Sequence, residues 1–171
     1  LFPDTYYFFG SARAADVVKM MRDNFNRKVS IGLAEDIEKS GKSLDEILTM
    51  ASIIQDEAYD GYAEKQTISG ILWKRIDKGM LLQVDATIRY VNGRGSSDIT
   101  MKDLGDDNPY NTYVHKGLPP TPIGSPGLEA IKAAMHPVAS AYFFYLHDRD
   151  ATIHYAKTYA EHKANIAKYL K

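Results

Sequence analysis

The stretch SLDEILTMASIIQDEAYDG, residues 43–61, contains the best-marked helix start in the sequence. Ser43 and Glu46 form an S-x-x-E capping box, in which each side chain bonds a backbone N–H group of the other residue. At about 100° per residue, the apolar side chains that follow fall on one stripe, the face expected to pack into a core. The stripe contains Leu44, Ile47, Leu48, Ala51, Ile54 and Ala58. We therefore predict a buried helix that ends near Gly61.

Glu57 lies beside this apolar stripe, whereas Asp56 points to the opposite, solvated side of the predicted helix. The carboxyl group of Glu57 is thus expected to project from an apolar surface. Burial disfavours the charged form of a carboxyl group and raises its pKa, and enzymes use this effect to keep an acid protonated near neutral pH. The pattern alone leaves two explanations open. Glu57 is either a proton donor or a structural carboxylate that reaches water or bonds a helix N-terminus.

Further helices are predicted on both sides of this stretch. Residues 11–25 show helical spacing with Ser11 as the cap, and a shorter helix is expected around residues 33–39. Downstream, a helix from about residue 63 to 78 is expected to stop at Gly79, a residue suited to a left-handed C-cap. A short helix capped by Asp85 and closed by an Asn-Gly turn should follow.

The second half of the chain predicts a long connection and a small sheet. Residues 96–127 are polar and rich in proline, and they are interpreted either as an ordered binding loop or as a plain surface excursion. Ser125 and Pro126 are expected to open another helix as its cap and first-turn proline. Residues 141–156 carry a β-hairpin signal, and Thr158 and Glu161 form a second capping box. The sequence therefore predicts an α+β domain in which several helices pack with a small antiparallel sheet and a long ordered polar loop.

Composition narrows the function classes. The 171 residues predict one domain, and the 21 basic and 22 acidic side chains give a formal net charge of -1 without a block of one sign, so no nucleic-acid arm is indicated. The absence of cysteine excludes disulfides, thiolate metal sites and a cysteine nucleophile. Neither a membrane span nor a signal peptide is visible. Because the sequence begins with LFPDTYYF, which looks like the interior of a structure, we interpret it as a piece of a longer protein.

Five segments give the sequence a family resemblance. They are LFPDTY, MASIIQDEA, LLQVDATIRY, NPYNTYVHKGLPPTPIGSPGLEAIKAAMHP and TIHYAKTYAEHKANIAKYL. In order and character they resemble the endolytic murein transglycosylases of the MltG, or YceG-like, family, and the resemblance covers essentially the whole chain. The long segment from NPYNTY onward is the most specific. Where the family usually reads ASIIEKE, this sequence reads ASIIQDE, so Gln55 replaces the first glutamate and Glu57 retains the second.

The resemblance implies an activity and a set of site residues. It implies cleavage of the β-1,4 bond between N-acetylmuramic acid and N-acetylglucosamine inside peptidoglycan strands, with formation of 1,6-anhydromuramyl ends, no cofactor, and Glu57 as the catalytic residue. A protonated acid at the leaving oxygen, which afterwards acts as a base, suits that chemistry. The candidate contacts to sugar hydroxyl and N-acetyl groups are Gln83, Asp85, Asn111, Thr112, Tyr113 and Ser125. A helix cap remains the structural alternative for both Asp85 and Ser125.

The resemblance also implies partners and a location. The expected partners are peptidoglycan glycan strands and cell-wall synthesis proteins, with no nucleic acid. The expected location is the extracytoplasmic face of the bacterial cytoplasmic membrane, reached through an N-terminal helix that this sequence does not contain. No metal site is predicted, because His147 and His154 flank the hairpin turn and could face each other but have no carboxylate or cysteine at ligand spacing. The alternative function is a non-catalytic glycan-binding module in which Glu57 is structural.

Overall fold

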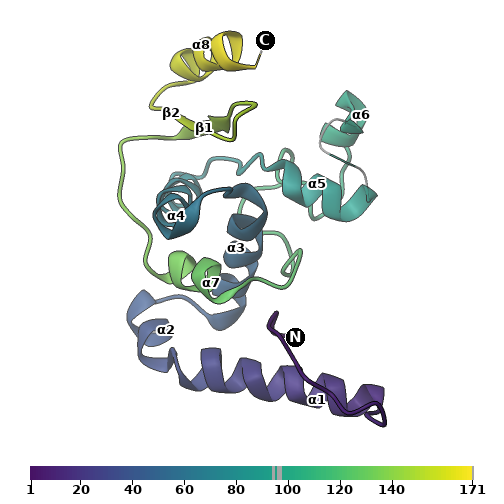
Figure 1. The fold of residues 1–171 in the computed structure, drawn as a ribbon. Helices are drawn as coiled ribbons and strands as arrows, with labels where there is room; N and C mark the ends of the chain where they lie inside the picture. The colour runs from purple at the N-terminus through teal and green to yellow at the C-terminus, as the bar shows by residue number, and fades with distance from the viewer. Residues whose placement is uncertain (94, 96–97, 171) are drawn as a thin grey trace.

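The computed structural model describes residues 1–93, 95 and 98–170, and it confirms the α+β prediction (Figure 1). Eight α-helices, one π-helix and a two-stranded antiparallel sheet occur in these residues. In chain order the elements are α1 (Ala14–Phe25), the π-helix η1 (Asn26–Ile31), α2 (Ala34–Ser40), α3 (Leu44–Glu57), α4 (Gly61–Asp77), α5 (Asp85–Asn92), α6 (Met101–Leu104), α7 (Leu128–Met135), β1 (Phe144–His147), β2 (Ile153–Ala156) and α8 (Tyr159–Tyr169).

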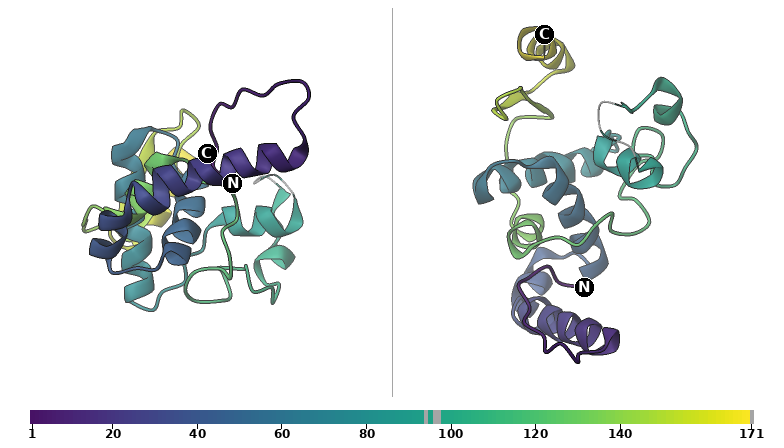
Figure 2. Two further views of the ribbon diagram at one scale, coloured as in Figure 1. Left: turned by 90° about the horizontal axis from the view of Figure 1, so that it is seen from below. Right: turned by 45° about the vertical axis from the view of Figure 1, so that its right-hand side comes forward.

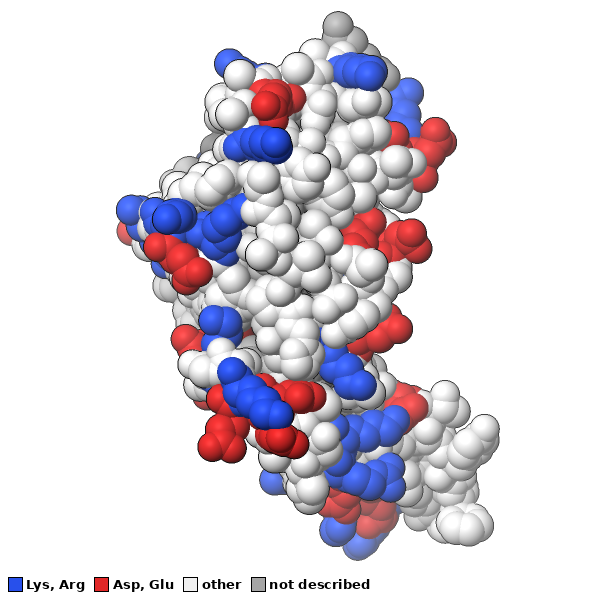
Figure 3. Space-filling model, turned by 90° about the vertical axis from the view of Figure 1, so that its left-hand side faces the viewer, with Lys and Arg blue, Asp and Glu red and all other residues white. Residues whose placement is uncertain are grey.

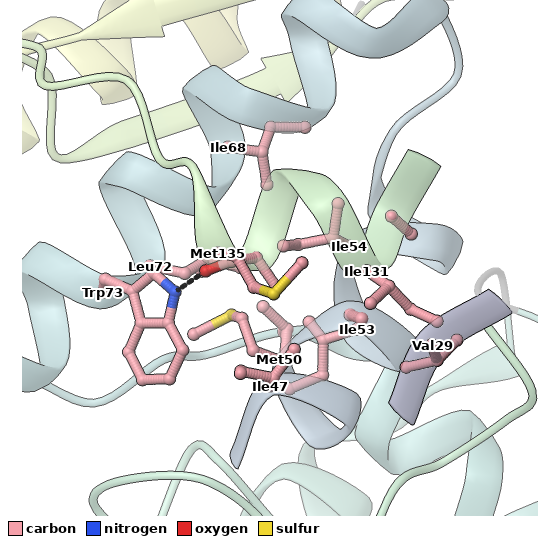
Figure 4. Packing of buried hydrophobic residues seen from close by; sticks show 14 of the residues in the cluster. Val29, Ile47, Met50, Ile53, Ile54, Ile68, Leu72, Trp73, Ile131 and Met135 are labelled. Carbon is pink, nitrogen blue, oxygen red and sulfur yellow. Dashed lines mark hydrogen bonds between the residues drawn. The ribbon is translucent and has the colours of Figure 1, made fainter. Parts of the chain in front are cut away.

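The core lies where α3, α4 and α7 pack against one another. Figure 4 shows its largest side chains, among them Ile47 and Ile54 from α3, Leu72 from α4 and Ile131 from α7, all without exposed surface. These positions confirm the predicted apolar stripe of α3. The indole N–H group of Trp73 donates a hydrogen bond of 2.9 Å to the carbonyl oxygen of Ala134, so the polar group of this buried ring has a hydrogen-bond partner.

Two of the predicted helix starts are confirmed by their cap geometry. The hydroxyl of Ser43 accepts a bond of 3.2 Å from the N–H group of Glu46, whose carboxylate accepts a bond of 2.8 Å from the N–H group of Ser43. Thr158 and Glu161 make the same reciprocal pair at the start of α8. Gly79 has the left-handed backbone expected of it, with φ at 64°. Strictly local signals thus predict these helix ends correctly.

Three other predicted caps are wrong. Helix α1 is capped by Arg13 and not by Ser11, because the carboxylate of Asp16 accepts the N–H group of Arg13. Asp85 is the first residue of α5, after Val84 at the cap position, and its carboxylate accepts a hydroxyl from elsewhere in the chain.

At the start of α7 the cap is Gly127, two residues after the predicted Ser125. The N–H group of Gly127 donates a bond of 3.1 Å to the side-chain oxygen of Gln55, an exposed residue in the last turn of α3. A partner 72 positions away therefore fixes this helix start, and a local capping rule does not include it.

The predicted connection of residues 96–127 is ordered by a buried amide. Ser96 and Ser97, with which it begins, lie outside the described residues. The side-chain amide of Asn111 is buried and donates to the carbonyl oxygens of Asp103, Leu104 and Asp106 at 3.2, 3.2 and 2.7 Å. The connection also contains α6, which the sequence analysis did not predict.

The hairpin of β1 and β2 is fastened to α4 by the segment that precedes it. In Figure 1 this segment descends from the hairpin past α4 to α7. A Cβ atom on Gly70 would overlap the carbonyl oxygen of Val138, so only glycine lets the segment cross α4 here. The N–H group of Val138 donates to the carbonyl oxygen of Gln66 at 3.0 Å, and the guanidinium of Arg75 donates to that of Phe143 at 2.8 Å. Helix α4 therefore positions the hairpin.

The molecule is extended, with α1 at one end, the helical core in the middle, and the hairpin and α8 at the other end (Figure 2). Basic and acidic side chains lie beside one another on the face shown in Figure 3, which agrees with the balanced charge of the sequence. In the part of the chain that the structure describes, we find no helix with the length and apolar character needed to cross a bilayer.

Candidate active site

A hollow of about 500 Å³ lies where the end of α3 meets the hairpin. Its walls come from six parts of the chain: the end of α3 with the turn after it, Arg75 of α4, residues 82–89, Tyr113, strand β1, and α8 with Leu170 after it. In both Figure 1 and Figure 2 the hairpin lies between α8 and the helical core. The hollow therefore joins segments that are far apart in the sequence.

Glu57, the last residue of α3, is half-buried in this hollow. Its Oε2 atom accepts a hydrogen bond of 2.8 Å from the phenol of Tyr145. Burial raises the pKa of Glu57, and the nearby charge of Asp85 raises it further. The bond from Tyr145, the charge of Arg89 and the backbone N–H group of Ala86 act in the opposite direction on this pKa. Glu57 is thus a carboxyl group biased toward its protonated form, as expected for a proton donor.

Two phenol and carboxyl pairs lie in the hollow. Tyr145 donates to Glu57, and Tyr113 donates to the Oδ1 atom of Asp85 at 2.6 Å. Burial, together with the adjacent carboxyl groups, raises the pKa of both tyrosines. Both hydroxyl groups therefore remain protonated near neutral pH and act as hydrogen-bond donors.

Arg75 provides a fixed positive charge in the same wall. It is 7% exposed, and its guanidinium donates to the carbonyl oxygens of Phe143 at 2.8 Å and Leu82 at 2.6 Å. The guanidinium also lies over the ring of Phe144, 4.9 Å from the ring centre. These contacts join strand β1 to the segment before α5, so Arg75 connects two walls of the hollow.

Asp56 differs from its neighbour Glu57. Its side chain is 52% exposed, as expected for the solvated side of α3, and it lies 3.6 Å from the guanidinium of Arg89 at the rim of the hollow. An ion pair this exposed contributes little to stability.

The structure brings three of the six predicted sugar contacts together with Glu57: Gln83, Asp85 and Tyr113. The backbone of Gln83 is left-handed, with φ at 51°, and its N–H group donates to the carbonyl oxygen of Thr112 at 3.0 Å. Strained backbone of this kind is often found where a side chain must be aimed at a site.

The other three predicted contacts lie elsewhere. Asn111 is buried under the loop that it orders. Thr112 is also buried: its hydroxyl lies 3.1 Å from that of Thr87 and accepts a hydrogen bond from the N–H group of Val84. Ser125 lies in a separate, smaller hollow of about 210 Å³ beside the N-terminal segment. Asn111 and Thr112 thus support the wall that carries Gln83 and Tyr113.

The two hairpin histidines do not face each other. The strand register pairs His147 with Ile153 and Leu146 with His154, so the histidine side chains leave opposite faces of the sheet. Across residues 1–93, 95 and 98–170, no three side chains of the metal-binding types are grouped closely enough to hold an ion.

The sequence analysis missed side chains that are far from Glu57 in the sequence but lie near it in the hollow, chiefly Arg75, Arg89 and Tyr145. The aromatic run of residues 142–145 predicted a strand, and it contains the tyrosine that bonds Glu57. Because side chains of a strand alternate between its two faces, some of these rings had to point toward the rest of the fold. The local pattern does not say which helix they meet there.

Comparisons with known proteins give consistent matches. The model of the YceG-like family matches residues 1–168. A Bacillus subtilis protein named endolytic murein transglycosylase is 35% identical over 171 residues, which is 99% of this chain and 47% of that protein. A protein of the same name from Streptococcus pneumoniae strain R6 is 27% identical over 99% of this chain and 32% of its own length. A crystal structure of a yceG-like protein from Listeria monocytogenes superposes with a TM-score of 0.87 at 34% identity, over 96% of this chain and 53% of that one. The chain therefore spans about half, or less, of the length of these relatives.

Proposed function

The chain belongs to the YceG-like family, and from this premise we propose that it is an endolytic lytic transglycosylase of peptidoglycan. The proposed reaction cleaves the β-1,4 bond between N-acetylmuramic acid and N-acetylglucosamine and leaves a 1,6-anhydromuramyl end. The observation that carries the proposal is the position of Glu57, a carboxyl group with a raised pKa that receives a hydrogen bond in a hollow of ligand size. The names of the Bacillus and Streptococcus relatives support the same class of reaction.

Glu57 acts twice in the proposed mechanism. As an acid it gives its proton to the glycosidic oxygen while the bond from that oxygen to the anomeric carbon breaks. As a carboxylate it then takes the proton of the muramic acid C6 hydroxyl, whose oxygen closes on the anomeric carbon. This step returns Glu57 to its protonated form, and it gains from proximity because the attack is intramolecular.

Tyr145 and Arg89 assist the first half of this cycle, in which Glu57 gives up its proton. The phenol of Tyr145 bonds the carboxylate that forms after the first proton transfer, and the positive charge of Arg89 favours the same ionised state. Burial favours the protonated state at the start of the cycle. The surroundings of Glu57 thus include groups that favour each of the two forms that a residue serving as acid and base must adopt.

Asp85 is the residue that a competing hydrolytic mechanism would use. A retaining or inverting hydrolase needs a second carboxylate, and Asp85 lines the same hollow as Glu57. In the proposed reaction Asp85 instead accepts the hydroxyl of Tyr113 and raises the pKa of Glu57. The two mechanisms differ in whether water enters the product.

The test is digestion of purified murein sacculi in oxygen-18 water, with mass analysis of the fragments. We expect anhydro ends without label from the wild-type chain and no release from the Glu57→Gln variant. Labelled reducing ends would identify a hydrolase. Equal release by the two proteins would remove Glu57 from the mechanism, and binding of sacculi without any release would favour the glycan-binding module.

The proposed partners and location follow from the family and not from the geometry. We propose that the substrate is a glycan strand of the cell wall, that cell-wall synthesis proteins are partners, and that the site of action is the extracytoplasmic face of the cytoplasmic membrane. Anchoring would require an N-terminal helix outside this chain. Cell fractionation of a tagged parent protein tests the proposed location, and recovery in the cytosol would contradict it.

A further inference from the structure

We propose that Glu64 and His147 are positioning residues for Glu57, the proposed catalytic residue. Their contact holds the turn after Glu57 against strand β1, and β1 carries Tyr145, the hydrogen-bond donor to Glu57. The inference rests on the proposed function, because it concerns how the carboxyl group of that function is held. Neither Glu64 nor His147 has a part in the mechanism above.

Two contacts of the same kind join β1 to the end of α3 and the start of α4. In the first, Tyr145 donates to Glu57, the last residue of α3. In the second, the Nε2 atom of His147 lies 3.1 Å from the Oε1 atom of Glu64, which is in the first turn of α4. Because side chains alternate along a strand, Tyr145 and His147 leave the same face of β1, and their ring centres are 6.3 Å apart. The two contacts are therefore neighbours on one face of the sheet.

The carboxyl group of Glu64 also holds the turn that follows Glu57. Its Oε1 atom accepts hydrogen bonds from the N–H groups of Tyr59 at 2.8 Å and Asp60 at 3.3 Å. The same oxygen is the one that contacts His147. A single atom thus connects the turn after the proposed catalytic residue with the strand that carries its hydrogen-bond donor.

The contact between Glu64 and His147 is shielded from water. Their side chains are 8% and 12% exposed, whereas those of the rim pair, Asp56 and Arg89, are 52% and 31% exposed. Solvent and salt weaken a polar contact less when it is buried. The contact of Glu64 is therefore better suited than the rim pair to fix a spacing.

Strand β1 needs such contacts, because a two-stranded hairpin has little stability of its own. Just before β1, the carbonyl oxygen of Phe143 accepts a bond from Arg75. His147 is the last residue of β1, so its contact with Glu64 holds the other end. Tyr145 lies between these two points, and its hydroxyl makes a bond of 2.8 Å. A displacement of β1 by roughly 1 Å would stretch that bond beyond the normal hydrogen-bond range.

A purely structural role is the alternative for Glu64. A carboxyl group in the first turn of a helix stabilises the helix start by itself. Such a role would leave the hydrogen bond from Tyr145 intact, whereas a positioning residue acts on Glu57 through that bond. Burial acts most strongly on the pKa of Glu57, and the groups that act on it among the described residues are Tyr145, Asp85, Arg89 and the N–H group of Ala86. An effect of Glu64 on this pKa would therefore come from a change of position and not from its own charge.

The experiment follows the titration of Glu57 in the chain by carbon-13 NMR of the glutamate carboxyl groups, with the signal assigned through Glu57→Gln. Glu64→Ala should move the midpoint of Glu57 to higher pH by about 0.5–1 pH unit, because the variant weakens the bond from Tyr145. The same substitution in the Tyr145→Phe background should cause no further movement, since that bond is already absent. Glu64→Gln keeps an accepting oxygen, so its midpoint should match that of the wild type.

His147→Leu tests the same contact from the strand, and it carries the test if Glu64→Ala does not fold. It should move the midpoint in the same direction, whereas His147→Gln keeps an N–H donor and should not. Glu46→Ala is the matched control. It also removes a carboxyl group that accepts a backbone N–H group at a helix start, but Glu46 lies at the opposite end of α3 from Glu57. This control should lower stability and leave the midpoint of Glu57 unchanged.

An unchanged midpoint in both Glu64→Ala and His147→Leu would overturn the inference. A movement to lower pH would overturn it as well, because Glu57 would then have gained solvent instead of losing its donor. So would an equal movement in Glu46→Ala, or an equal effect of Glu64→Ala in the Tyr145→Phe background.

The titration needs no substrate, so its outcome is separate from that of the proposed function. A chain whose Glu57 midpoint depends on Glu64 and His147 but that forms no anhydro ends keeps the positioning residues and loses the function. A chain that forms anhydro ends while the midpoint is independent of both residues keeps the function and loses the inference.

Discussion

The hydroxyl of Tyr145 donates a hydrogen bond of 2.8 Å to the Oε2 atom of Glu57, and this bond joins residues 88 positions apart. It connects the hairpin to the end of the core helix, and it opposes the effect of burial on the pKa of Glu57. The protonation of the proposed catalytic residue therefore depends on the placement of a two-stranded sheet.

Replacing Tyr145 with phenylalanine should raise the pKa of Glu57, because the variant loses a bond that favours the ionised carboxylate. Since the proposed reaction begins with protonated Glu57, the alkaline limb of the pH profile of kcat/KM should move to higher pH, while kcat falls. Tyr142→Phe is the control, because Tyr142 stacks on Tyr155 outside the hollow. A Tyr145→Phe profile that coincides with the wild-type profile would contradict the role given to this bond.

The Glu57→Gln variant should lose cleavage and gain stability near neutral pH. Folding raises the pKa of Glu57 above its unfolded value, so the unfolded chain releases this proton first and wild-type stability falls as pH rises through that window. Glutamine has no proton to release, and its side-chain oxygen can still accept the hydroxyl of Tyr145. Urea denaturation should show nearly equal stability at about pH 4 and a more stable variant at about pH 7.5. A variant that is less stable at both values would contradict the burial cost.

Local patterns explain which parts of this structure were predictable. The Ser43 and Glu46 box and the apolar stripe of α3 depend on residues within one or two turns, and both were predicted correctly. The start of α7 depends on Gln55, which lies 72 positions from Gly127, and the predicted cap at Ser125 was wrong.

In the candidate site, too, the features that depend on local sequence were predictable and those that depend on distant residues were not. Glu57 could be singled out from its place beside the stripe and from the family resemblance, whereas Tyr145 reaches it only through the tertiary fold. Asn111 and Thr112 had the right chemistry for sugar contacts, but both are buried: the amide of Asn111 bonds carbonyl oxygens of its own loop, and the hydroxyl of Thr112 accepts the N–H group of Val84 before α5. The type of a side chain predicts which hydrogen bonds it can make, and its position in the fold decides whether its partner is a ligand or the protein itself.

Replacing Gly70 with alanine should destabilise the fold by about 1–3 kcal/mol and reduce activity. The added methyl group would overlap the carbonyl oxygen of Val138, so the segment that carries the hairpin must move away from α4. Gly124→Ala is the control, because a Cβ atom there meets nothing within 4 Å. Equal thermal midpoints for the two variants would show that the segment adapts and does not fix the hairpin.

Replacing Asp56 with asparagine should change stability by less than about 1 kcal/mol, because its ion pair with Arg89 is long and exposed. Cleavage should fall far less than in Glu57→Gln, since Asp56 lies at the rim and Glu57 receives the bond from Tyr145. The two variants should be compared on the same sacculi. Losses of equal size would mean that the acid is not Glu57 alone.

The Asp85→Asn variant separates an electrostatic role of Asp85 from a covalent or basic one. The negative charge of Asp85 raises the pKa of Glu57, so its removal should lower that pKa. The alkaline limb of the activity profile should then move to lower pH, opposite to the shift expected for Tyr145→Phe. Asparagine can still accept the hydroxyl of Tyr113, so the wall of the hollow should persist. The products should remain unlabelled anhydro ends when the digestion is run in oxygen-18 water. Complete loss of cleavage at every pH, with the fold intact, would instead make Asp85 the second carboxylate of a hydrolase.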